Sequence, residues 1–258
     1  FGAATGAFLA GFYLPPALGF KKSYLVAILL NVLIGLVALW WSRSERWTAP
    51  VPDLAPTPLE TRAEDSPTLS PALVWIAAIV SGFATLGLEV LWVRMFAQVL
   101  QNSVYTFSAT LTVFLVALAL GSGVANLLCR SSLRPPVVLL WLVTLAGFLV
   151  GLTPFVLYRL TTGLELLGPD KGWSGYMVSV FGLVFLVLLI PVAVIGAVFP
   201  FLMKLSESWM KSAGRTIGRL ASSNTAAAII GSLAAGFFLL DSIGLWASIR
   251  LMAMVYFV

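Results

Sequence analysis

A chain of 258 residues in which 60% of the side chains are hydrophobic and only 10% are charged, with a net charge of +5, is not an ordinary soluble domain. Its mean hydropathy of +1.02 and its long apolar runs indicate a polytopic membrane protein. The absence of histidine and the single cysteine, Cys129, argue against haem, catalytic zinc, an iron–sulfur cluster and a disulfide framework, so we expect no cofactor and no metal. We also expect no nucleic-acid partner.

Eight apolar runs are candidates for membrane-spanning helices, because about 20 helical residues cross a bilayer. In chain order they cover residues 1–14, 23–42, 71–97, 104–128, 137–160, 174–204, 217–240 and 245–258. The first and last runs are too short, since each covers only about two-thirds of the hydrocarbon core at about 1.5 Å per residue. We therefore expect both ends of the sequence to lie inside the membrane and the sequence to be part of a longer protein.

The first apolar run returns near the end of the chain. Gly6–Phe20 matches Gly231–Leu245, at an offset of 225 residues, in six of fifteen positions. Three of the identities are glycines, in the pairs Gly6/Gly231, Gly11/Gly236 and Gly19/Gly244. Apolar composition alone does not preserve glycine spacing, so the pattern predicts a duplication.

The repeat predicts how the chain is divided. Residues 71–258 are expected to be a second half of six helices, residues 1–42 the last two helices of a first half, and residues 43–70 a Pro-rich cytoplasmic linker. Four helices of the first half would then precede Phe1. Two parallel six-helix halves are the layout of the major facilitator superfamily, whose substrates bind between the halves near the midplane. The expected fold is therefore all-α, a polytopic helical membrane protein with major-facilitator-like duplicated halves.

Lysine and arginine residues are unequally divided between the two sides that this arrangement predicts. One side carries Arg43, Arg46, Arg62, Arg130, Arg134, Lys204, Lys211, Arg215 and Arg219. The other carries Lys21, Lys22, Arg94, Arg159 and Lys171. Because cytoplasmic loops hold the excess of positive charge, the first side is predicted to be cytoplasmic, together with the C-terminus.

Glu89 lies inside the apolar run 71–97. A carboxylate near the bilayer centre costs about 2.5 kcal/mol or more, so it normally faces the protein interior and has a partner. Arg94 is five positions further on, and the two side chains diverge by about 140° around a helix, so we do not expect them to pair. Glu89 is a candidate for a proton or cation relay, and a structural hydrogen bond to another helix is the favoured alternative. Arg94 suits a position at the outer interface, where its side chain would snorkel to water.

Two further groups of polar residues are candidates for a site. The turn after Glu89 carries Gln98, Gln101, Asn102, Tyr105 and Ser108. These could line an outward-facing vestibule, although polar residues are expected in any interfacial turn.

Arg250 lies inside the last apolar run. If it is embedded in the membrane, it needs an acidic or carbonyl partner, and Asp241 and Glu89 are the acidic candidates. If that helix is tilted, Arg250 snorkels instead.

The repeated glycines are first of all candidates for helix packing. Small residues lie four positions apart in the pairs Gly2/Gly6, Ala227/Gly231 and Gly231/Ala235, a spacing that lets helices approach closely. We therefore expect Gly6, Gly11, Gly231 and Gly236 to lie at helix interfaces.

Three prolines, Pro154, Pro191 and Pro200, interrupt apolar runs. Such prolines mark kinks that transporters use in gating, but membrane helices also tolerate them for local reasons.

Four motifs stand in order along residues 81–225. They are Ser81-Gly-Phe-Ala-x-Leu-Gly-x-Glu-Val-Leu-Trp-x-Arg94, Asn102-Ser-Val-Tyr-x-Phe-Ser108, Gly196-Ala-Val-Phe-Pro200 and Gly218-Arg-Leu-Ala-Ser-Ser-Asn-Thr225. Together they resemble the membrane half of the fused major-facilitator/spermidine-synthase proteins. The resemblance implies a bacterial inner-membrane protein whose relatives often carry a cytosolic aminopropyltransferase-like domain after the membrane helices. Residues 126–134 lack the aspartate of the loop that major facilitators carry there.

Two functions follow as hypotheses. The first is a membrane anchor or scaffold for a cytosolic synthase-like domain or a larger membrane complex, with the lipid bilayer as its other partner. The alternative is a secondary transporter or exporter of small metabolites, cationic polyamine-like ones among them, with Glu89 as the charge that meets substrate or proton. The chain carries no catalytic constellation, so any aminopropyltransferase-like activity would lie in a domain outside these residues.

Overall fold

The computed structural model describes residues 1–44, 70–131, 133–168, 172–206 and 213–257, so most of the predicted linker lies outside the described residues. Every regular element in these ranges is helical, which confirms the all-α prediction. The α-helices are α1 (Gly2–Phe8), α2 (Leu14–Ser44), α3 (Pro71–Phe96), α4 (Val104–Cys129), α5 (Pro135–Leu160), α6 (Gly172–Ser206), α7 (Ala213–Leu233), α8 (Leu240–Ser242) and α9 (Leu245–Val255). Two π-helical segments, η1 (Leu9–Tyr13) and η3 (Ala234–Leu239), interrupt them.

Six helical stretches of the described chain are long and apolar enough to cross a membrane, where the sequence predicted eight runs. They are Gly2–Trp41, Pro71–Phe96, Val104–Cys129, Pro135–Leu160, Gly172–Ser206 and Thr216–Ser242. The first two predicted runs fall within the single stretch Gly2–Trp41, and the last has only the 11 helical residues of α9. The chain is a polytopic α-helical membrane protein.

The long helices begin at local signals in the sequence. The Ser70 hydroxyl accepts a hydrogen bond from the Leu73 backbone N–H at 3.3 Å, and Pro71 occupies the first helical position of α3. Ser103 caps α4 in the same way through the Thr106 N–H at 3.2 Å. Helix α5 begins with Pro135, whose missing N–H would have no partner in the first turn. These signals place the turns between the helices.

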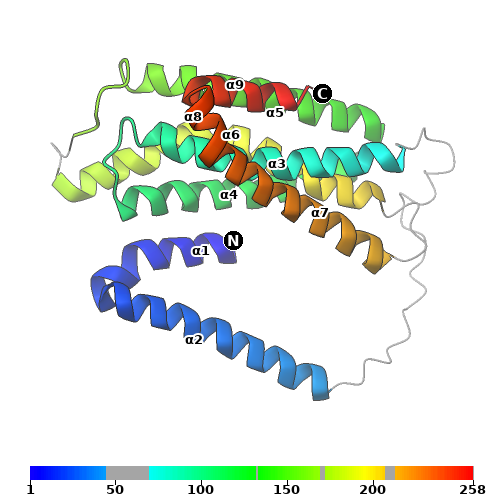
Figure 1. Ribbon diagram of the computed structural model, residues 1–258, viewed down its shortest axis with the longest axis horizontal. Helices are drawn as coiled ribbons and strands as arrows, with labels where there is room; N and C mark the ends of the chain where they lie inside the picture. The colour runs from blue at the N-terminus through cyan, green and yellow to red at the C-terminus, as the bar shows by residue number, and fades with distance from the viewer. Residues whose placement is uncertain (45–69, 132, 169–171, 207–212, 258) are drawn as a thin grey trace.

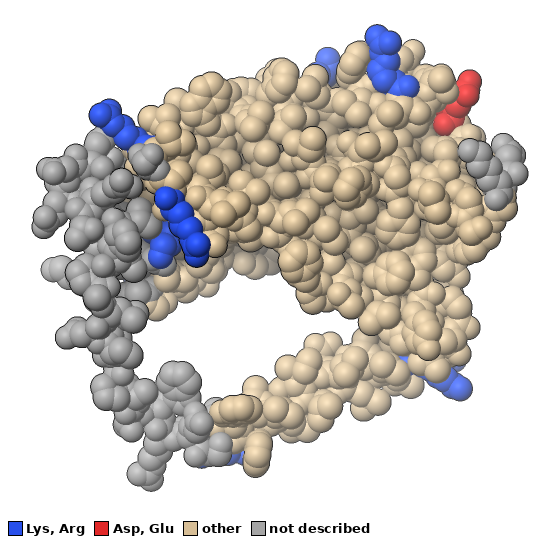
Figure 2. All heavy atoms as spheres, turned by 180° about the vertical axis from the view of Figure 1, so that it is seen from behind, with Lys and Arg blue, Asp and Glu red and all other residues tan. Residues whose placement is uncertain are grey.

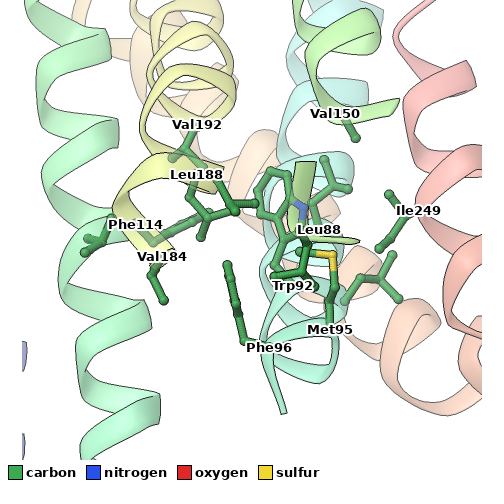
Figure 3. Packing of buried hydrophobic residues seen from close by; sticks show 14 of the residues in the cluster. Leu88, Trp92, Met95, Phe96, Phe114, Val150, Val184, Leu188, Val192 and Ile249 are labelled. Carbon is green, nitrogen blue, oxygen red and sulfur yellow. The ribbon is translucent and has the colours of Figure 1, made fainter. Parts of the chain in front are cut away.

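The core lies where α3 meets α4, α5, α6 and α9 (Figure 3). Large side chains of α3, among them Leu88, Trp92 and Phe96, are buried there against Phe114 of α4 and Leu188 of α6. Helices α4 and α6 also approach closely at two glycines, since Gly121 lies beside the Ala193 carbonyl and Gly196 beside Leu118. Pro191 and Pro200 are both accommodated within the continuous helix α6.

The first 44 residues form an arm that lies mostly apart from this bundle (Figure 1). The chain reverses direction at Gly19, whose φ of 74° is non-helical, so that α1–η1 and the rest of α2 form a V. The first limb contacts α4, whereas α2 contacts mainly η1 beside it in the chain. Figure 2 shows an open gap between α2 and the bundle, and charged side chains of the described residues lie at the margins of the face shown.

Three local conformations recur at the offset of the sequence similarity. The π-helices η1 and η3 begin at Leu9 and Ala234. Each is followed by a glycine with positive φ, 74° at Gly19 and 76° at Gly244. The Ser23 hydroxyl donates a hydrogen bond to the Gly19 carbonyl at 2.8 Å, and the Ser248 hydroxyl donates to the Gly244 carbonyl at 2.6 Å. The turns of the two segments are therefore built alike.

Candidate functional site

Glu89 lies on α3 and is half-buried. The neighbouring Leu88 is fully buried in the core, and Val90 lies beside Gly236 of η3. Within the described part of the chain, the Glu89 carboxyl group forms neither a hydrogen bond nor an ion pair, so the partner expected on another helix is not supplied by these residues. Arg94 is exposed and does not pair with Glu89.

Glu89 ends a row of polar side chains on α3 that the sequence analysis missed. Ser81, Thr85 and Glu89 are four residues apart and so share one side of the helix, and we call them the α3 polar stripe. Ser81 is buried, and the Thr85 hydroxyl donates to the Ser81 carbonyl at 2.7 Å. The i, i+4, i+8 spacing of polar residues in an apolar run is the signal that could have revealed the stripe.

Two further polar groups lie against α3 beside this stripe. The Asn224 side chain of α7 approaches the backbone at Gly82, and its Oδ1 atom is buried. The Tyr256 hydroxyl, at the end of α9, is buried near Thr85. The Asn224 Oδ1 atom has no hydrogen-bond partner among the described residues, although buried polar atoms usually have one. This atom and the Glu89 carboxyl group leave unused hydrogen-bonding capacity around the middle of α3.

The predicted vestibule residues separate into two environments. Asn102 is exposed in the turn before α4. Tyr105 instead packs in an aromatic cluster, with its ring 4.7 Å from that of Trp173 and 5.7 Å from that of Phe12, centroid to centroid. The contact with Trp173 is edge-to-face and the contact with Phe12 is tilted, so packing explains the position of Tyr105. The structure does not bring Asn102 or Tyr105 to Glu89.

Arg250 and Asp241 are both exposed and do not meet. The Arg250 Nε atom donates a hydrogen bond to the Trp246 carbonyl of its own helix at 3.3 Å. Neither Asp241 nor Glu89 forms an ion pair with Arg250 among the residues that the structure describes. Arg250 therefore has a backbone carbonyl, that of Trp246, as its partner, which is one of the two partner types that the sequence analysis expected.

The four repeated glycines have unequal surroundings. A Cβ atom at Gly231 would collide with the Phe83 carbonyl of α3, and one at Gly11 would collide with the Ser108 side chain of α4. At Gly236 a Cβ would make an ordinary contact of 3.7 Å with Val90, and at Gly6 it would meet nothing within 4 Å. Close helix approach therefore requires glycine at positions 11 and 231.

No protein-family model, no curated protein and no solved structure matches this chain. Within the described ranges, no three acidic or cysteine side chains gather into a group that could hold a metal ion. What the composition and the helices establish is a polytopic membrane protein, and the α3 polar stripe is its candidate for a functional site.

Proposed function

We propose that this chain is the membrane domain of a two-half, major-facilitator-like protein and anchors a cytosolic synthase-like domain or a larger membrane complex. The observation that carries the proposal is α2, in which residues 24–41 are apolar apart from Asn31 and are all exposed apart from the half-buried Val26. A helix that is hydrophobic all round requires lipid or protein on every side. Its aromatic residues lie near its two ends, Phe20 and Tyr24 at one and Trp40 and Trp41 at the other, and suit the two membrane–water interfaces of a spanning helix.

The two-half organisation is supported by the conformations that recur 225 residues apart. A π-helix, a positive-φ glycine and a serine bonded to that glycine's carbonyl occur once in residues 9–23 and once in residues 234–248. We assign residues 1–42 to the first half, 43–70 to the linker and 71–258 to the second half. The excess of lysine and arginine on one side supports a cytoplasmic C-terminus. A bacterial inner membrane is what the resemblance to the fused major-facilitator/spermidine-synthase proteins implies.

The mass of the intact protein, isolated from its own membrane, tests the anchor proposal. We expect a polypeptide well above the 27.6 kDa of this chain, with peptides that continue beyond Phe1 and Val258 and include a synthase-like sequence after the last helix. The measurement is intact mass spectrometry combined with peptide sequencing across both ends. A mass equal to that of this chain would contradict both the two-half organisation and the fused anchor.

A second function, transport of small cationic metabolites, is favoured by the α3 polar stripe. A carboxyl group at membrane depth with hydroxyl groups on the same side of the helix is suited to meet a cation or a proton. In proteoliposomes, with spermidine as the probe, we expect Glu89→Gln to lower uptake at least tenfold if the protein transports. Glu165→Gln is the matched control, because Glu165 is exposed in the turn after α5. Equal uptake in both variants would remove Glu89 from any transport role and leave the scaffold.

A further inference from the structure

Two arginines flank the turn between α4 and α5. Arg130 directly follows the last residue of α4, and Arg134 directly precedes the first residue of α5. Each of these helices has 26 residues and is therefore about 39 Å long, close to the thickness of about 40–45 Å that a bilayer has with its headgroup regions included. The two arginines therefore lie at the level of the lipid headgroups.

Both guanidinium groups are open to the surroundings. Arg130 and Arg134 are exposed, and neither side chain forms a hydrogen bond or an ion pair within the described part of the chain. Only four positions separate the two residues, so their Cα atoms are at most about 14 Å apart. Two side chains as long as these can therefore reach one ligand that lies between them.

The acidic residues that the structure describes lie away from this pair. Glu89 is inside α3, and Glu165 and Asp241 are at the other end of the bundle, after α5 and η3 (Figure 1). Figure 2 shows lysine and arginine side chains at its left end, where α5 begins, and an acidic side chain at its right end. Cations at headgroup level that lack a negative partner attract an anion.

The backbone at the start of α5 offers no donor to such an anion. A helix N-terminus usually binds anions through its free N–H groups. Here Pro135 and Pro136 have no N–H, and the N–H groups of Val137 and Val138 donate to the Arg134 carbonyl at 3.0 and 3.1 Å. The arginine side chains must therefore hold the anion. A guanidinium group suits phosphate, because it can donate two parallel hydrogen bonds to the phosphate oxygens.

Apolar side chains continue from the arginine pair into the membrane. Leu133, between the two arginines, is 61% exposed. Val137, Leu140 and Trp141 share one side of α5 and are all exposed as well. This side extends over about 10 Å from Arg134 to Trp141. An acyl chain can cover it, whereas a free phosphate cannot.

We infer that the arginine pair and the exposed side of α5 form a binding site for an anionic phospholipid. The phosphate lies between Arg130 and Arg134, and an acyl chain lies along Val137, Leu140 and Trp141. A zwitterionic lipid fits less well, because none of the described acidic residues is at this end of the bundle to meet its ammonium group. The site requires only that these helices span a membrane, so it is independent of the proposed anchor and transport roles.

The double variant Arg130→Gln/Arg134→Gln tests the site in the whole protein, purified in detergent. Native mass spectrometry measures the affinity for the first bound molecule of phosphatidylglycerol and, separately, of phosphatidylcholine with the same acyl chains. We expect the native protein to bind phosphatidylglycerol at least tenfold more tightly than phosphatidylcholine, and the variant to lose this preference. A native protein without the preference would overturn the inference.

The matched control is Arg43→Gln/Arg219→Gln, which removes the same charge from two other exposed arginines, near the end of α2 and the start of α7. Both lie at the same end of the structure as the arginine pair (Figure 1). We expect this control to change the preference by less than twofold. Equal losses in the two double variants would mean that the general excess of positive charge attracts the lipid, and the site would be wrong.

Two measurements on the native sequence complete the test, and they apply even if the double variant fails to fold. Phosphatidylglycerol with a photoactivatable group on its acyl chain should cross-link to residues 133–141, as located by peptide sequencing. Cross-links at other residues alone would contradict the inference. Inorganic phosphate should not displace the lipid at equal concentration, and displacement would show that the site takes a free phosphate instead.

Discussion

Replacement of Gly121 by alanine should destabilise the protein, whereas the same replacement at Gly123 should not. Gly121 is buried where α4 meets α6, and a Cβ atom there would collide with the Ala193 carbonyl and come within 2.9 Å of the Gly196 carbonyl carbon. Because both obstacles are backbone, the two helices would have to separate. Overpacking of this kind costs about 1–3 kcal/mol. We expect a loss of that order in the free energy of unfolding, measured by denaturant titration in detergent.

Gly123 is the control for this prediction because it lies on the same helix and a Cβ there would meet nothing within 4 Å. Alanine restricts the unfolded chain more than glycine does and is the better helix former by about 1 kcal/mol. Gly123→Ala should therefore be neutral or slightly stabilising. Two variants with the same stability would show that α4 and α6 are not in backbone contact at Gly121.

The positions of the helices could be predicted from the sequence because apolar length and breaking residues are local properties. The runs at 71–97 and 104–128 differ from α3 and α4 by only one residue at their C-terminal ends. The separation of runs 1–14 and 23–42, which has Pro15, Pro16, Lys21 and Lys22 between them, agrees with the reversal at Gly19. The count of spans differs because the two runs on either side of Gly19 form one helical stretch, Gly2–Trp41, bent at that residue, and because α9 is short.

The surroundings of individual side chains could not be predicted, because they depend on how each helix is rotated against its neighbours. The sequence predicts that Glu89 lies inside an apolar helix, yet its lack of a partner within the described chain follows only from the placement of α3 against α7 and η3. The approach of Asn224 to Gly82 joins residues far apart in the sequence. Likewise, Gly6 and Gly231 align in the sequence similarity, but of the two only a Cβ atom at Gly231 would meet another helix within 4 Å.

Substitution of Trp92 by alanine is expected to have the largest effect of any single change in the core. The side chain is 1% exposed, and its ring contacts that of Phe114 at a centroid distance of 6.3 Å. Its indole N–H donates to the Thr153 hydroxyl of α5 at 3.0 Å, so one residue joins three helices. Removal of a buried tryptophan leaves a cavity and costs about 3–5 kcal/mol. Trp141→Ala, at a position that is 70% exposed on α5, should cost much less.

The hydrogen bond can be separated from the packing by a double-mutant cycle. Thr153→Val retains the shape of the side chain but leaves the buried indole N–H without its acceptor, a loss of about 1–3 kcal/mol. In Trp92→Phe the donor is absent, so Thr153→Val should then cost less than in the native protein, and the cost that remains comes from the lost bond of the Thr153 hydroxyl to the Val150 carbonyl at 2.8 Å. Helices inside a bilayer gain little from the hydrophobic effect when they associate, so packing and internal hydrogen bonds must hold α3 to α5. Additive effects of the two substitutions would mean that this bond does not contribute, and that packing alone fixes the helix carrying Glu89.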